Sequence, residues 1–274
     1  MIPFTKAHAC GNDFLIVTEE AAQGHEWSAL TQRLCARNTG VGADGIEFFA
    51  WTGERSGRIR LHNADGSIAE ISGNGTRCVA AWMAVLLDAK PGDELRIETD
   101  AGLRICHVNA VRKAAGYAVD VTTSMGAPVV ARKSIKLADG TKIQGIEVST
   151  GNPHFVIVVD NAAFEVAGKS WQEIGAAICP HPDFPQQTNV EFVRILAPHE
   201  IEIRIFERGV GPTTSSGTGS SASAAAVIAL HGCASRLTVF APGGPQTVEW
   251  AGEGNELLLT GPAALIARGE AWER

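Results

Sequence analysis

The sequence predicts an α/β protein made of two similar halves, each a β-sheet wrapped around one central helix. Three observations lead to this prediction. Short motifs recur in the same order at a shift near 140 residues. Many short apolar or alternating runs, separated by turn clusters, are typical of strands. In each half, an alanine-rich apolar stretch (residues 78–89 and 221–231) follows a serine-glycine turn and predicts a buried helix.

The internal repeat rests on three matches. Residues 11–17 resemble residues 151–158 with one residue inserted, and residues 46–48 match residues 190–192. The turns Ser-Gly-Asn-Gly at 72–75 and Ser-Gly-Thr-Gly at 216–219 match at the same shift of 144. Three matches in one order favour a duplicated domain. With a boundary near Ala115-Gly116, we expect an N-terminal domain of residues 1–116 plus 264–274 and a C-terminal domain of residues 117–263.

The remaining elements follow in chain order. Strands are predicted at residues 14–17, 46–51, 95–98, 117–121, 154–159, 189–196, 202–206, 237–240 and 256–260. Turn clusters at 90–93, 138–140 and 241–244 separate several of them. Two further helices are predicted at residues 27–38, closed by Gly40, and at 171–178, closed by Pro180.

Composition excludes several classes of protein. The net charge of −7 argues against a nucleic-acid binder and leaves no polybasic patch for a membrane. No apolar run is long enough to span a bilayer, and the first residues lack a signal-peptide layout, so we expect a cytoplasmic protein. None of the six cysteines forms a C-x-x-C pair, which predicts reduced, mostly buried thiols and no metal site. Glycine, at 30 of 274 residues, exceeds the usual level of about 7%, which indicates tight turns and close backbone approaches.

The two serine-glycine turns are the first candidates for chemistry. Glycines just before a helix let backbone N–H groups converge on a ligand, and the helix N-terminus favours negative charge. Two such turns would hold one carboxylate-bearing substrate from two sides. The alternative is that Ser72 and Ser216 only cap their helices, a role that serine fills well.

Asparagines, a charged pair and a histidine complete the candidates. Neutral amides donate to a carboxylate and accept from an ammonium group, so several amides in one pocket suit an amino acid. The asparagines in loops or at strand ends are Asn12, Asn63, Asn152 and Asn189, and each could instead be a turn residue, Asn63 above all. Arg208 would bind a carboxylate and Glu207 an ammonium group, unless they form a surface ion pair. His154 is a general acid or base, or structural support.

A dinucleotide-binding fingerprint is rejected. Residues 217–222 fit the pattern G-x-G-x-x-A. They follow a long loop rather than a strand, and no acidic residue occurs about 20 positions later.

Taken together, these residues resemble the diaminopimelate epimerase family. The resemblance spans nearly the whole chain, and its segments are residues 9–14, 40–45, 63–67, 72–78, 151–154 and 207–211. It implies two similar α/β domains with the site in the cleft between them, a homodimer, and conversion of LL- to meso-diaminopimelate for lysine and peptidoglycan precursors. It also implies inversion at Cα without pyridoxal phosphate, other cofactor or metal, by one residue that removes the α-proton and another that delivers a proton to the opposite face.

The resemblance assigns these roles to particular positions. Ser72 and Ser216 occupy the places of the two catalytic cysteines, and His154 lies beside the site. The substrate contacts fall on Asn12, Asn63, Gly73, Asn74, Asn152, Asn189, Glu207, Arg208, Gly217 and Thr218. The backbone N–H groups of Gly73, Asn74, Gly217 and Thr218 would hold the α-carboxylate.

Two departures from the family pattern stand out. Both cysteines are serines, and the acidic residue after Gly211 is Pro212. A serine hydroxyl ionises far less readily than a thiol and usually needs an adjacent base. Three explanations of the serines are open. They are natural residues of a slower enzyme, they were engineered to stop turnover, or the protein has taken another role. Pro212 favours natural divergence. The alternatives are a diverged racemase, isomerase or lyase of the same fold and a non-catalytic amino-acid-binding protein.

Overall fold

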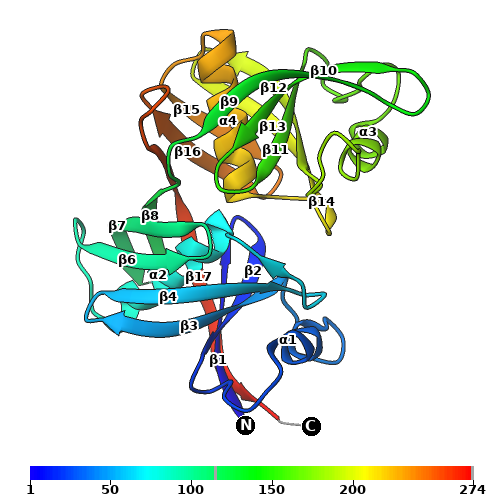
Figure 1. Cartoon of the computed structure of the whole chain (residues 1–274). Coiled ribbons are helices and arrows are strands. Elements are labelled where there is room, and N and C mark those ends of the chain that lie inside the picture. The colour runs from blue at the N-terminus through cyan, green and yellow to red at the C-terminus, as the bar shows by residue number, and fades with distance from the viewer. Residues whose placement is uncertain (114–115, 273–274) are drawn as a thin grey trace. The chain divides into compact units, whose positions relative to one another are not determined.

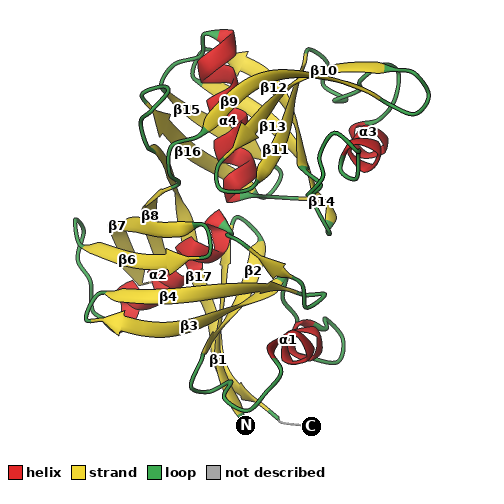
Figure 2. Ribbon diagram, in the orientation of Figure 1, coloured by secondary structure: helices red, strands yellow, loops and turns green. Residues whose placement is uncertain are grey.

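A computed structural model describes residues 1–113 and 116–272. Two compact units divide the chain: unit 1 is Met1–Ser124 with Thr260–Arg274, and unit 2 is Met125–Leu259. Within the described residues there are four helices and 17 strands, which confirms the mixed α/β class (Figures 1 and 2). None of these helices is long and apolar enough to cross a membrane.

Unit 1 combines two helices with strands that form a closed ring. Its elements are β1 (Ile2–Ala9), β2 (Asn12–Thr18), α1 (Trp27–Cys35), β3 (Gly45–Gly53), β4 (Ser56–Asn63), β5 (Ile68–Ala69), α2 (Gly73–Leu86), β6 (Glu94–Thr99), β7 (Gly102–Lys113), β8 (Tyr117–Ser124) and most of β17 (Leu257–Ala271). Pairing runs from β1 through β2, β3, β4, β6, β7, β8 and β17 back to β1. The pairs β2–β3 and β4–β6 are parallel.

Helix α2 passes through this ring, with strands on several sides of it in Figure 2. Residues from Gly73 to Ala81 are all buried, and Val79, Ala80 and Met83 pack with strand residues in one apolar core. The helix is rich in glycine and alanine, so the strands can approach it closely. A helix that is apolar around its circumference is stable only when it is enclosed in this way.

Unit 2 repeats this order of elements. They are β9 (Val129–Lys136), β10 (Lys142–Ser149), β11 (Pro153–Val159), α3 (Trp171–Ile178), β12 (Asn189–Ala197), β13 (Glu200–Glu207), β14 (Gly211–Thr213), α4 (Gly217–His231), β15 (Arg236–Ala241), β16 (Gly244–Trp250) and the start of β17. The pairs β11–β12 and β13–β15 are parallel, like their counterparts in unit 1. Helix α4 is buried from Gly217 to Val227 and contacts the surrounding strands.

Two sequence expectations differ from the structure. The helix predicted at 27–38 ends earlier, at Cys35, because Ala36 is extended and the backbone turns back to place Gly40 on the helix end. A Cβ at Gly40 would lie 2.3 Å from the Arg33 carbonyl oxygen, so only glycine fits there. The unit boundary follows Ser124 rather than residue 116, since β8 pairs with β7 and β17; Ala115 lies outside the described residues.

The expectation of reduced, mostly buried thiols is confirmed. None of the six cysteines is joined in a disulfide among the described residues; five are buried and Cys233 is partly buried.

Candidate functional site

Both serines cap the helices that they precede. Ser72 and Ser216 have extended backbones, and their hydroxyl oxygens accept hydrogen bonds from Gly75 N at 3.0 Å and Gly219 N at 3.2 Å. The predicted capping contacts are therefore present at both serines. Capping uses the oxygen as an acceptor, and each hydroxyl still carries its own proton.

The helix starts create two places suited to an anion. The first N–H groups of a helix lack partners within the helix and sit at the positive end of its dipole. In α2 these groups belong to Gly73 and Asn74, and in α4 to Gly217 and Thr218; all four residues are buried. Each unit can therefore offer backbone N–H groups to a carboxylate.

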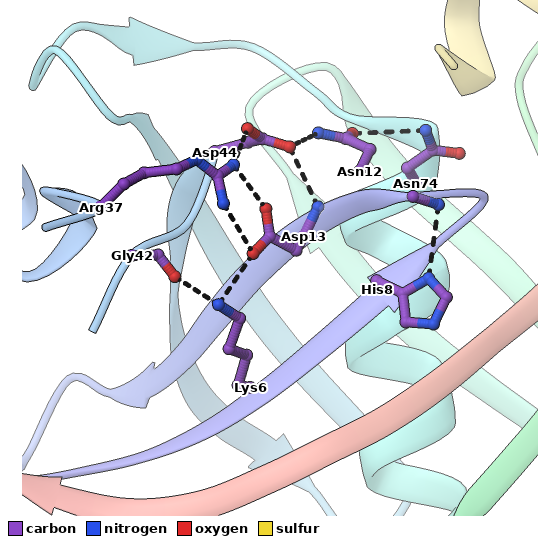
Figure 3. Close-up of polar contacts among 9 residues, drawn as sticks. Lys6, His8, Asn12, Asp13, Arg37, Gly42, Asp44 and Asn74 are labelled. Carbon is purple, nitrogen blue, oxygen red and sulfur yellow. Dashed lines mark hydrogen bonds and ion pairs between the residues drawn. The ribbon is translucent and has the colours of Figure 1, made fainter. Parts of the chain in front are cut away.

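In unit 1, a chain of hydrogen bonds links helix α2 to strand β2 (Figure 3). The fully buried Arg77 donates to Asn74 Oδ1 at 2.5 Å, and Asn74 Nδ2 donates to Asn12 Oδ1 at 3.3 Å. Asn12 Nδ2 in turn donates to Asp44 Oδ2 at 2.7 Å. The structure thus joins two predicted substrate-binding amides, Asn12 and Asn74, and fixes how each amide is turned.

A cluster of charges supports this chain (Figure 3). Arg37 binds Asp44 at 2.6 Å and Asp13 at 2.9 Å, and Lys6 binds Asp13 at 2.9 Å. Burial alone would raise the pKa of Asp13, but the hydrogen bonds from Arg37 and Lys6 outweigh it and lower that pKa below its ordinary value. Asp13 is therefore a carboxylate at neutral pH, and the cluster holds Asp44 in place beside Asn12.

Asn63 lies at the end of β4 and bonds locally. Its Nδ2 donates to Ser67 Oγ at 3.0 Å, and its backbone N–H donates to the Ser67 carbonyl at 2.8 Å. The next residue, Ala64, donates its N–H to the Asp44 carbonyl at 2.9 Å. Asn63 therefore behaves as a turn residue whose turn is attached to the Asp44 segment.

In unit 2, polar side chains form a continuous line from Ser216 inward. Ser216 Oγ lies 3.3 Å from Thr218 Oγ1, and Asn152 Nδ2 lies 3.5 Å from the same Thr218 oxygen. Asn152 Oδ1 accepts from His154 Nε2 at 2.9 Å, and His154 Nδ1 lies 2.7 Å from Glu191 Oε1. Four residues that the sequence singled out are thus brought together with a glutamate that it did not assign.

The His154–Glu191 pair is enclosed by protein. Both side chains are fully buried. Burial raises the pKa of Glu191, and the neighbouring His154 offsets part of that rise. Because His154 Nε2 donates a hydrogen bond to Asn152 Oδ1, the hydrogen bond between Nδ1 and the carboxyl oxygen needs one further proton, which the two groups share. The pair can therefore store one proton at the inner end of the line.

Asn189 and Arg208 lie on neighbouring strand ends. Asn189 is directly opposite His154 in the parallel pairing of β11 and β12. Its Nδ2 donates to the Pro153 carbonyl at 3.1 Å, and its Oδ1 accepts from Arg208 N at 2.9 Å. The Arg208 guanidinium donates to the Gln186 carbonyl at 3.0 Å. Glu207, the last residue of β13, is partly buried.

Sequence reasoning missed the two buried glutamates, Glu47 and Glu191. Both are fully buried on central strands at positions 144 apart, and each carboxyl lies against the first turn of the following central helix. The signal was present as Ile46-Glu47-Phe48 and Val190-Glu191-Phe192, which served only to support the repeat. A glutamate inside an apolar strand is rarely buried without a specific reason.

The Cys78 thiol, six residues after Ser72, is not available as an acid or base. Burial raises the pKa of the Cys78 thiol far above its ordinary value, and Cys78 packs in the core of unit 1. Pro212 is exposed on the short strand β14, opposite Phe206. In the described part of the chain, no group of three or more His, Cys, Asp or Glu side chains could hold a metal ion.

The chain is similar to known proteins over nearly its full length. The family model described as diaminopimelate epimerase matches residues 4–131 and 146–266. Diaminopimelate epimerase of Desulforudis audaxviator is 36% identical over 289 residues, covering 99% of each chain. That of Heliobacterium modesticaldum is 34% identical over 285 residues, covering 97% of this chain and 98% of the relative.

Solved structures share the fold. A probable proline racemase from Agrobacterium radiobacter has a TM-score of 0.74 at 16% identity, covering 98% of this chain and 92% of the other. A hydroxyproline epimerase from Agrobacterium vitis has a TM-score of 0.69 at 16% identity, covering 98% of this chain and 90% of the other. At such identities the likeness concerns the fold alone. On the strength of the full-length matches, the chain belongs to the diaminopimelate epimerase family.

Proposed function

We propose that this protein inverts one Cα of diaminopimelate, converting the LL to the meso form without a cofactor, with Ser72 and Ser216 at the two acid–base positions. The observation that carries the proposal is the pair of serines at equivalent helix starts, one in each unit, in a chain that matches diaminopimelate epimerases over its full length. One serine removes the α-proton while the other delivers a proton to the opposite face.

The helix starts of the two units, with the polar side chains around them, offer the binding groups that this reaction needs. The N–H groups of Gly73, Asn74, Gly217 and Thr218 are suited to the α-carboxylate, whose negative charge grows as the α-proton leaves. The side chains proposed to bind the rest of the substrate are Asn12, Asn63, Asn152, Asn189, Glu207 and Arg208. Two of them, Asn12 and Asn152, are already held by neighbours on the same unit, which reduces the cost of ordering them on binding.

Hydrogen exchange tests the proposal directly. In D₂O, the wild-type protein should introduce deuterium at Cα of LL- and meso-diaminopimelate, detected by mass spectrometry and NMR. Ser72→Ala and Ser216→Ala should each abolish inversion. A wild-type protein that introduces no deuterium, even at high concentration, would contradict the proposal.

A non-catalytic amino-acid-binding protein is the second candidate. It is favoured by the serines themselves, because an alcohol is a much weaker acid than a thiol. Calorimetry distinguishes the two functions: tight binding of diaminopimelate with no exchange would support the binding protein. We further propose that the protein acts in the cytoplasm as a homodimer descended from a duplicated domain; sedimentation velocity tests the dimer.

A further inference from the structure

Glu47 is a buried carboxyl group without a partner. Its side chain is fully buried on β3, where its register neighbours are Ile16 on β2 and Leu61 on β4. Within residues 1–113 and 116–272, neither carboxyl oxygen has a hydrogen-bond partner. Buried polar groups are almost always hydrogen-bonded, so an exception in the wall around α2 calls for a physical explanation.

The Glu47 carboxyl and Ser72 both lie next to Gly75. Gly75 N donates to Ser72 Oγ at 3.0 Å. A Cβ built on Gly75 would lie 1.9 Å from Glu47 Oε1 and 3.2 Å from Ser72 Cβ. The carboxyl and the serine therefore converge on the same residue, in the first turn of α2, and only a glycine leaves room for both.

The surroundings of Glu47 favour its protonated form. Burial raises the pKa of Glu47 to about 8, and no cation in the described part of the chain offsets this effect. Among the described residues, the Cys78 thiol on α2 interacts electrostatically with Glu47, and burial keeps that thiol protonated. Glu47 thus holds a proton at neutral pH and releases it slightly above neutral pH.

Unit 2 shows the same arrangement with one difference. Glu191 lies 144 residues after Glu47, and a Cβ on Gly219 would lie 2.9 Å from Glu191 Oε1 and 3.3 Å from Ser216 Oγ. Glu191 is bonded to His154, which lies opposite Asn189 in the strand pairing. The corresponding position of unit 1, opposite Gly45, is occupied by Phe14. Glu47 therefore lacks the imidazole that Glu191 has.

We propose that Glu47 is the proton partner of Ser72, acting on the substrate only through the serine hydroxyl. This inference rests on the proposed function. When Ser72 is the acid, its O–H bond breaks, its proton forms the new Cα–H bond, and Glu47 passes its carboxyl proton to Ser72 Oγ. When Ser72 is the base, the Cα proton forms a new O–H bond and the original hydroxyl proton moves to the Glu47 carboxylate. The hydroxyl and the carboxyl must approach more closely than in the resting structure.

This role answers the chemical problem that serine poses. A hydroxyl that must take up and give back a proton usually needs an adjacent base to receive the displaced one. A buried carboxyl that titrates close to neutral pH is matched to that task, since general acid–base catalysis works best when the pKa is close to the operating pH.

The first test follows a thiol rather than turnover. In Ser72→Cys, alkylation of the introduced thiol by iodoacetamide is followed between pH 6 and 10 by mass spectrometry of the peptide that contains it. Ionised Glu47 opposes thiolate formation, so adding Glu47→Gln should lower the midpoint by about one pH unit. In Ser216→Cys, the matched control in unit 2, Glu47→Gln should leave the profile unchanged. Coincident profiles at position 72 with and without Glu47 would overturn the proposal.

The second test measures deuterium exchange into diaminopimelate. Glu47→Gln keeps the side-chain shape and should slow exchange about 10²-fold, with loss of the pH dependence near 8. Glu47→Leu removes the polar group while filling the space. It should slow exchange as Glu47→Gln does, even if it is more stable than the wild type. Glu98→Gln, at an exposed carboxylate on β6, should keep the full rate. The loss from Glu47→Gln should shrink in Ser72→Cys, because a thiol ionises with less help.

The outcomes separate the two proposals. Normal exchange in Glu47→Gln and Glu47→Leu would overturn the role of Glu47 while leaving the epimerase intact. Coupled alkylation in Ser72→Cys, together with no exchange by the wild-type protein, would contradict the proposed function and support the proton coupling between Glu47 and position 72.

Discussion

The Asn74 amide donates to the Asn12 amide oxygen at 3.3 Å, which ties the first turn of helix α2 to the start of strand β2. Neither amide is free to rotate, because Arg77 holds Asn74 from one side and Asp44 holds Asn12 from the other. Two substrate-binding groups proposed for unit 1 are thus oriented before substrate arrives. Preorganisation of this kind improves binding without adding contacts.

Removal of Asp44 should therefore weaken substrate binding more than it weakens folding. In Asp44→Ala, Asn12 loses its acceptor and the Arg37 guanidinium loses one of its two carboxylates. We expect KM for diaminopimelate to rise about tenfold, which corresponds to about 1.4 kcal/mol, with kcat changed far less. Arg58→Met, which breaks an ion pair with Glu19 at 2.9 Å in the same unit, is the control. Equal KM values in the two variants would show that Asp44 does not position Asn12.

The close approach of Glu47 to Gly75 makes a steric prediction. Gly75→Ala should destabilise the protein by about 1–3 kcal/mol, because the new methyl group would lie 1.9 Å from Glu47 Oε1. Gly219→Ala should cost less, since its clash with Glu191 is milder at 2.9 Å. Shortening the acid with Glu47→Asp should recover part of the loss. Urea denaturation compares the wild type, Gly75→Ala, Gly219→Ala and the double variant Gly75→Ala with Glu47→Asp. Equal losses of unfolding free energy in Gly75→Ala and Gly219→Ala would contradict the packing described.

The stability of the protein should depend on pH through Glu47. The pKa of Glu47 is raised by burial to about 8 in the folded protein, whereas an unfolded glutamate has a pKa near 4.3. The folded form therefore binds the proton more tightly, and the free energy of unfolding falls as the pH rises between these two values. We expect a loss of a few kcal/mol between pH 5 and 8 that is absent in Glu47→Gln. Parallel stability curves for the two proteins would refute this.

The buried pair in unit 2 makes a different prediction. His154→Ala leaves the Glu191 carboxyl without its partner, and breaking a buried pair from one side costs about 3–5 kcal/mol. Glu191→Gln keeps a polar group of the same shape next to the imidazole and should cost less. The double variant His154→Ala with Glu191→Gln should lose less unfolding free energy than the two single variants lose together. The reason is that the two side chains interact directly, at 2.7 Å. A coupling free energy near zero in urea denaturation would contradict the pairing.

Restoring thiols tests what the serines change. A double variant with Ser72→Cys and Ser216→Cys should catalyse exchange at least about 10²-fold faster than the wild type and should be inactivated by thiol-alkylating reagents. The natural thiols, five of which are buried, provide the background in the wild-type protein. An inert double variant would show that the pocket differs from that of the family beyond these two residues.

The sequence predicted the helices and the repeat better than the full set of strands. Central helices α2 and α4 are marked by serine-glycine starts and alanine-rich runs, and α3 (Trp171–Ile178) was predicted with its observed bounds. Strand β9 (Val129–Lys136) was missed because it is mostly exposed, which leaves its alternation weak. Strand β4 (Ser56–Asn63) was also missed, although its sequence carries the alternation of a strand: buried Ile59 and Leu61 alternate with Arg58 and Arg60.

The site divides in the same way. Residues that belong to a local motif, such as Ser72, Ser216 and Asn152, were identified from the sequence. Partners that meet only through folding, such as Arg37 with Asp44 or Glu191 with His154, were not, because nothing in a linear sequence states which strand ends become neighbours. The buried glutamates were visible as charges in apolar runs, but their contact with the helix starts depends on the three-dimensional packing.

Deuterium exchange with matched serine variants tests the central claim most directly. Wild-type protein is incubated in D₂O with LL-diaminopimelate, beside Ser72→Ala, Ser216→Ala and the control variant Ser56→Ala, at a half-buried serine at the start of β4. Loss of a capping serine costs only about 1 kcal/mol, so the variants remain folded at low temperature. The account predicts α-deuterated meso-diaminopimelate from the wild type and from Ser56→Ala, and none from the two site variants. Exchange at the wild-type rate in either site variant, or its absence in the wild type, would contradict the account.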